Sequence, residues 1–101
     1  MAYETGSLDV ALNAVVGDDQ ALMAELRQAF ISSAERQIDL LQRSRCDANW
    51  HFAALRLKGL AASFGVGQVI ELADQALEGA PGDPVVLRSL QQAVSGLNRL
   101  N

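Results

Sequence analysis

The chain has few of the residues that build covalent frameworks and metal sites. Cys46 is its only cysteine and His51 its only histidine. A single cysteine excludes an internal disulfide and a thiolate metal cluster, so Cys46 is read as a bystander thiol. One histidine and one cysteine leave a zinc ion short of ligands, and no acidic residues stand at ligand spacing with His51. We therefore expect no metal and no cofactor.

Positive charge is also scarce, and long apolar runs are absent. Eight basic residues stand against twelve acidic ones, which gives a formal net charge of -4. This balance provides no electrostatic footprint for nucleic acid or for an anionic membrane. No apolar run approaches the ~20 residues that span a bilayer, and the N-terminus has no basic region followed by an apolar one. We expect a cytoplasmic protein that binds neither nucleic acid nor membrane.

Aromatic residues make up only 5% of the chain, although half of it is hydrophobic. The interior must therefore be built mainly from Leu, Ala, Val and Ile, which suits close helix packing better than a β-sandwich. The expected class is all-α. With 101 residues, the chain is long enough for one core, so residues 1–101 are expected to form a single domain.

Apolar residues recur every three or four positions and predict five helices. A short first helix, capped by Ser7, covers residues 8–16 and ends at Gly17. A longer helix, capped by Asp18 or Asp19, extends to about residue 45, and its length is typical of bundle proteins. Its expected inward stripe consists of Leu22, Leu26, Ala29, Phe30, Ser33, Ala34, Ile38 and Leu41.

Three further helices follow in the second half of the chain. Asp47 looks like the cap of a helix over residues 48–64, which is interrupted by Gly65 and Gly67. A fourth helix covers about 68–77. Asp83 and Pro84 then begin a last helix that extends to about residue 100. Short connections between long helices force antiparallel neighbours, so we expect an up-down antiparallel four-helix bundle with a short additional N-terminal helix.

The helix over residues 48–64 has two distinct faces when its residues are placed about 100° apart. The inward face consists of Trp50, Ala53, Ala54, Leu57, Leu60, Ala61 and Phe64. The outward face consists of His51, Leu55, Lys58 and Ala62, with Phe52 and Gly59 next to them. Two neighbouring exposed apolar side chains are either incidental or part of a partner site. Gly59 favours the partner site, because a mid-helix glycine costs roughly 1 kcal/mol relative to alanine.

One segment of this helix carries a family resemblance. The string Ala54-Leu55-Arg56-Leu57-Lys58-Gly59 continues with Ala61, Ala62, Phe64 and Gly65. It resembles the core of histidine-containing phosphotransfer (HPt) domains, whose signature reads Ala-His-x-Leu-Lys-Gly, then small residues, an apolar residue and Gly. Leu55 stands where that family has its histidine. Because an alkyl side chain has no lone pair, it cannot attack a phosphoryl group.

The resemblance implies the HPt bundle and a place in a bacterial two-component phosphorelay. In that family the lysine puts positive charge beside the phosphoryl group and the glycine clears space for the partner, and Lys58 and Gly59 match these positions. The favoured hypothesis is a module that binds receiver domains of response regulators without carrying phosphate. A sensor histidine kinase is a second candidate partner. The expected contact residues are His51, Phe52, Leu55, Lys58, Gly59 and Ala62, and no catalytic residue is expected.

Two alternatives remain open. In the first, His51 is a displaced phosphoacceptor, one turn before Leu55 on the same face. The supporting residues have not moved with it, because Ala54 and Leu55 follow it by three and four positions where the family has lysine and glycine. In the second alternative, the domain is a structural or dimerisation bundle in which Phe52 and Leu55 are buried against a second copy.

Overall fold

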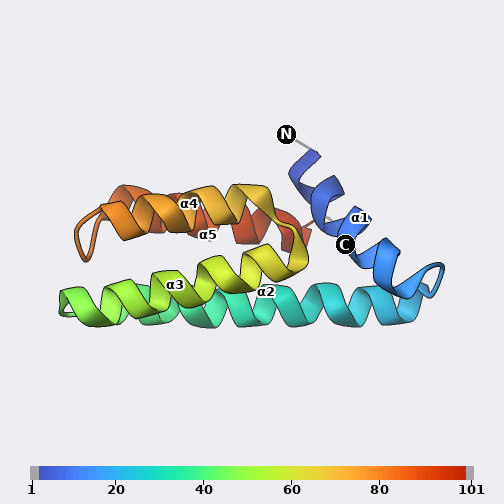
Figure 1. Cartoon of the computed structure of the whole chain (residues 1–101), viewed down its shortest axis with the longest axis horizontal. Helices are drawn as coiled ribbons and strands as arrows, with labels where there is room; N and C mark the ends of the chain where they lie inside the picture. The colour runs from blue at the N-terminus through green and yellow to red at the C-terminus, as the bar shows by residue number, and fades with distance from the viewer. Residues whose placement is uncertain (1–2, 100–101) are drawn as a thin grey trace.

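The computed structural model describes the backbone of residues 3–99 and the side chains of residues 8–97, and within this range the fold is all-α (Figure 1). The helices are α1 (Tyr3–Val16), α2 (Gln20–Arg43), α3 (Asp47–Phe64), α4 (Gly67–Glu78) and α5 (Pro84–Arg99). None of the helices in the described part combines the length and the hydropathy needed to span a bilayer.

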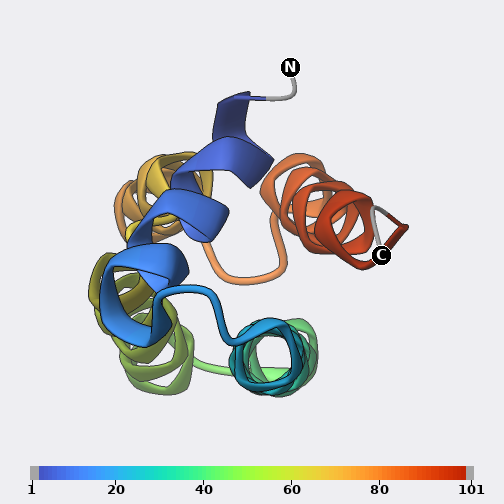
Figure 2. The ribbon, with the colours of Figure 1, turned by 90° about the vertical axis from the view of Figure 1, so that its right-hand side faces the viewer.

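The four helices α2 to α5 are arranged so that each one packs against two of the others, which forms a closed ring. Helix α2 packs against α3 and α5, and α4 packs against the same two helices. The chain reverses direction at each of the three connections between α2 and α5 (Figure 1). Viewed end-on, α2 to α5 surround a common core, while α1 crosses one end of the molecule and contacts α2, α3 and α4 (Figure 2).

The core is mainly aliphatic, as the shortage of aromatic residues predicts. Three aromatic residues contribute to it: Trp50 and Phe64 at opposite ends of α3, and Phe30 on α2. The buried Trp50 donates a hydrogen bond from Nε1 to the backbone oxygen of Ala76 at 2.6 Å, which ties the start of α3 to the end of α4. Phe64, near the end of α3, packs against Phe30 of α2 with 5.1 Å between the ring centroids.

Several helix ends are formed by the residues that the sequence predicts. The Asp19 carboxylate accepts a hydrogen bond from the Leu22 amide at 3.0 Å, so Asp19 rather than Asp18 caps α2. Gly65 ends α3 in the left-handed region, at a φ of 71°. At the start of α5, the Asp83 carboxylate accepts from the Val85 amide at 3.0 Å. Two of these ends are capped by an aspartate carboxylate that accepts a backbone hydrogen bond. The third ends at a glycine, which adopts the left-handed conformation readily.

Other predicted ends are wrong by up to five residues. Helix α1 begins at Tyr3, so Ser7 lies inside it instead of capping it. The Gly6-Ser7 pair does not break the helix, because a glycine costs only about 1 kcal/mol there. Asp47 is the first residue of α3, and Cys46 occupies the capping position without a side-chain hydrogen bond. Helix α2 ends at Arg43, α4 spans one residue more at each end than predicted, and the predicted end of α5 near residue 100 lies outside the described residues.

The inward face of α2 is rotated relative to its predicted stripe. Leu22 and Ala29 are exposed, whereas the neighbouring Ile31 is fully buried. The buried residues are Arg27, Phe30, Ile31, Ala34, Ile38 and Leu41.

Arg27 is the buried charged residue of the described chain, with a side chain 8% exposed. It forms an ion pair with Asp9 of α1 and donates a hydrogen bond to the backbone oxygen of Leu97 of α5 at 3.2 Å. Because hydrogen bonds from a charged group contribute about 1.5–3 kcal/mol, this side chain fastens α1 and the end of α5 to α2.

Candidate functional site

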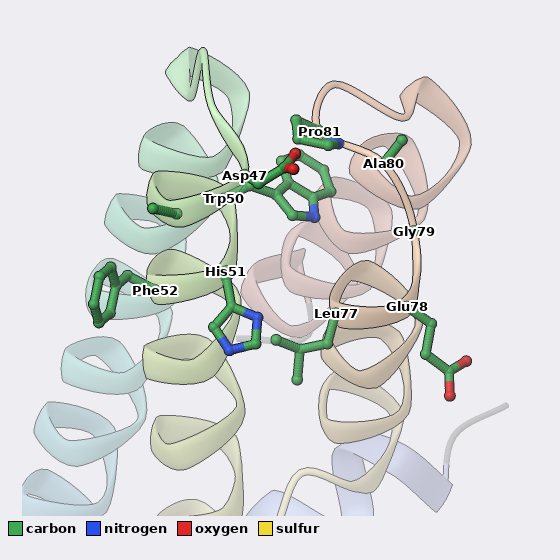
Figure 3. A pocket seen from close by; sticks show the side chains of 10 residues that line it. Asp47, Trp50, His51, Phe52, Leu77, Glu78, Gly79, Ala80 and Pro81 are labelled. Carbon is green, nitrogen blue, oxygen red and sulfur yellow. The ribbon is translucent and has the colours of Figure 1, made fainter.

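The candidate site is the solvent side of α3, and we call its residues the α3 face: His51, Phe52, Leu55, Lys58, Gly59 and Ala62. Phe52 is 60% exposed and Leu55 is 43% exposed. His51, Gly59 and Ala62 are also exposed, and Lys58 is half-buried. The six predicted residues thus lie on the solvent side of α3, with His51 and Phe52 pointing toward its two opposite flanks (Figure 3).

This exposure follows from how α3 packs on its other side. Five of the seven predicted inward residues, Trp50, Ala53, Ala54, Leu57 and Ala61, are buried, whereas Leu60 and Phe64 are half-buried. Since α3 packs mainly against α2 and α4 through this side, its opposite side faces solvent in the described part of the chain. The outward direction of the α3 face is therefore fixed by the core.

Gly59 leaves an open notch in the middle of the α3 face. A Cβ atom added to this residue would meet no atom within 4 Å, so the protein's own packing does not require a glycine. A mid-helix glycine nevertheless costs roughly 1 kcal/mol relative to alanine. The open space is available to a molecule that approaches α3 closely from outside.

Lys58 has a partner that the sequence did not reveal. Its Nζ atom lies 2.8 Å from Oδ1 of Asp74 on α4, and both side chains are almost half exposed. Exposed ion pairs contribute only about 0–1 kcal/mol to stability. The pair nevertheless places a carboxylate beside the positive charge that borders the α3 face.

A cleft with a volume of about 810 Å³ adjoins the α3 face where the start of α3 meets the end of α4 and the α4–α5 connection (Figure 3). Its lining residues are Asp47, Ala48, Trp50, His51, Phe52, Leu77, Glu78, Gly79, Ala80 and Pro81. The His51 imidazole lies on the side toward Leu77, whereas the Phe52 ring points the opposite way (Figure 3).

The titratable side chains that line this cleft are Asp47, His51 and Glu78. The described residues contain no group of three or more His, Cys, Asp or Glu side chains placed to hold a metal ion. His51 has no hydrogen bond or ion pair within the described part of the chain. A histidine used as a base or nucleophile is normally oriented by such a partner, whereas His51 is an exposed side chain at the edge of the cleft.

Comparison with known proteins gives no family assignment: no family model matches the chain, and neither a curated protein nor a solved structure does. The resemblance to HPt domains therefore remains an expectation from the sequence of residues 54–65.

Proposed function

We propose that the chain is a degenerate HPt-like module of a bacterial, cytoplasmic two-component system. In this proposal α2 to α5 form the antiparallel four-helix bundle and α1 is the additional helix. The α3 face binds receiver domains of response regulators, and the module itself carries no phosphate. A sensor histidine kinase is a second candidate partner that could use the same surface.

The observation that carries the proposal is the exposure of Leu55, which occupies the place of the phosphoacceptor histidine and is 43% exposed. An exposed leucine can contact a partner but cannot accept a phosphoryl group. Phe52, which is 60% exposed, extends the apolar surface by one turn, and Gly59 leaves room beside it. The α3 face thus keeps an exposed apolar contact surface, although it lacks the histidine nitrogen that accepts phosphate in HPt domains.

The size of the apolar contact agrees with a docking role. Full burial of a Leu or Phe side chain contributes about 1.5–3 kcal/mol. With exposed fractions of 43% and 60%, burying the rest of Leu55 and Phe52 would contribute roughly 1.5–3 kcal/mol together. This corresponds to about 10–150-fold in affinity. The two residues can act as anchors of an interface whose remaining area comes from their surroundings.

The test measures binding of a panel of purified receiver domains by calorimetry. Leu55→Glu is expected to weaken binding about tenfold or more, because it removes an anchor and places a charge in the contact. Val85→Glu is the matched control, since Val85 is 65% exposed and lies on α5. Equal affinity of the wild-type and Leu55→Glu proteins would contradict the proposal.

The same proteins test the alternative in which His51 carries phosphate. Wild-type protein is incubated with a phosphorylated receiver domain and examined for acid-labile label. Label that disappears in a His51→Ala variant would establish His51 as the acceptor and refute the phosphate-free module. Dimers that form at micromolar concentration and dissociate in Leu55→Glu would favour the dimerisation bundle.

A further inference from the structure

A second groove lies on the other flank of α3 from the cleft in Figure 3, on the side to which Phe52 points. It runs between the end of α2 and the first half of α3 and has a volume of about 430 Å³. We call it the α2–α3 groove, and its lining residues are Leu40, Arg43, Ser44, Asn49, Phe52, Ala53 and Arg56. The half-buried Leu40 and the buried Ala53 give it an apolar floor.

The lining of this groove is cationic in an acidic protein. Arg43 and Arg56 line it, and no carboxylate does. The cleft in Figure 3 is instead lined by Asp47 and Glu78, and a third groove, of about 220 Å³ between α2 and α5, contains two acidic residues. With a net charge of -4 for the whole chain, the α2–α3 groove is a local reversal of sign.

The two arginines are available to an incoming anion to different degrees. Arg56 is exposed and has no ion pair or hydrogen bond within the described residues. Arg43 pairs with Asp39 at 3.0 Å, but both side chains are more than half exposed, and such pairs are weak. A guanidinium group binds a carboxylate through two parallel hydrogen bonds, which makes arginine well suited to acidic ligands.

We propose that the α2–α3 groove binds an acidic peptide segment of a partner protein. Carboxylates of the segment pair with Arg56 and Arg43, and an apolar side chain of the segment packs against the exposed ring of Phe52. A peptide fits better than a nucleic acid or a lipid surface, because the groove offers only two cations beside an apolar floor. A phosphate-rich partner needs an extended basic surface, which a chain with a net charge of -4 does not provide.

This inference goes beyond receiver docking and can fail independently of it. Leu55 and Gly59 of the α3 face do not line the groove, although Phe52 belongs to both surfaces. Leu55→Ala is therefore expected to weaken receiver binding and to leave peptide binding unchanged. Arg56→Glu is expected to weaken peptide binding whether or not a receiver domain is the partner.

The experiment screens fluorescein-labelled decapeptides that combine glutamate or aspartate with leucine or phenylalanine against the full chain. Acidic peptides are expected to bind at least about tenfold more tightly than analogues carrying Gln and Asn, and their affinity should fall as salt is added. Arg56→Glu should weaken binding about tenfold or more. Arg88→Glu is the charge-matched control, because Arg88 is an exposed arginine of α5 that does not line the groove.

Circular dichroism establishes that the Arg56→Glu and Arg88→Glu variants are folded. Both are expected to fold, because Arg56 and Arg88 are exposed. The inference is overturned if no acidic peptide binds, if acidic and amide peptides bind equally, or if Arg88→Glu weakens binding as much as Arg56→Glu. It is also overturned if an RNA oligonucleotide or a phosphatidylserine vesicle binds the groove in preference to every peptide.

Discussion

Replacing Leu55 with histidine restores the residue that the HPt signature has at this position. We expect the Leu55→His variant to accept a phosphoryl group from a phosphorylated receiver domain, because a ring nitrogen then stands on the exposed α3 face. Full burial of a leucine side chain contributes about 1.5–3 kcal/mol to stability. Because Leu55 is 43% exposed, its replacement removes slightly more than half of that contribution. The loss of about 1–2 kcal/mol is smaller than the ~5–15 kcal/mol that stabilises a typical domain.

The yield of phosphorylated protein depends on the charge near the new imidazole. Side chains three positions apart on a helix are about 5–6 Å apart, which places Lys58 next to residue 55. At about 5 Å in water, a pair of unit charges interacts with ~0.8 kcal/mol, or roughly fourfold in an equilibrium constant. The Asp74 carboxylate, 2.8 Å from the lysine nitrogen, offsets part of this attraction. Asp74→Asn is therefore expected to raise the phosphorylated fraction of the Leu55→His variant up to about fourfold.

The assay transfers radiolabelled phosphate from a receiver domain that the wild-type chain binds, and it detects acid-labile label on the variant. Leu55→Gln provides a polar control without a ring nitrogen, and Val85→His places the same ring on an exposed site of α5. Neither control is expected to become labelled. A folded Leu55→His protein that binds the receiver domain but stays unlabelled would refute the likeness of the α3 face to an HPt docking surface.

Three further predictions concern stability and are measured by urea unfolding followed by circular dichroism. Arg27→Met is expected to lower the unfolding free energy by about 1–3 kcal/mol, because it removes the charged hydrogen bonds that join α1, α2 and α5. Trp50→Phe is expected to cost about 0.5–1.5 kcal/mol, since it removes the indole donor to the Ala76 oxygen, which then keeps only its bond from the Gly79 amide. Gly65→Ala is expected to destabilise more than Gly17→Ala: both have positive φ, but only Gly65 also has a neighbouring α1 side chain 3.3 Å from the added Cβ. Equal effects of these two alanine variants would show that the contact with α1 carries no cost.

The periodicity of α3 predicted its two faces because every residue of the inward sector is apolar. In α2 the apolar residues spread over a wider arc, and the predicted stripe included Leu22 and Ala29, which are exposed. Arg27 did carry a usable signal, since it lies three and four positions before Phe30 and Ile31 on the buried side. A charged residue on an apolar stripe indicates a partner from another helix, although it does not identify that partner.

Contacts between helices could not be read from the sequence in the same way. The Lys58–Asp74 pair joins α3 to α4 and depends on the relative rotation of the two helices. The α2–α3 groove brings Arg43 together with Arg56, which lie on different helices on either side of a short connection. Local propensity fixes the direction of a side chain on its own helix, whereas these pairings are set by packing against the neighbour.

The interactions missed by the sequence reasoning lie in different parts of the molecule, and this separation bears on how the proposals can be tested. Arg27 joins α1 and the end of α5 to α2 at one end (Figure 1). The α2–α3 and α4–α5 connections, with the two clefts beside Phe52, lie at the other end. Because effects of distant, unconnected substitutions usually add, Arg27→Met should lower stability without changing receiver or peptide affinity in the folded protein. Arg56→Glu should do the reverse, so a loss of binding in Arg56→Glu can be attributed to the groove rather than to unfolding.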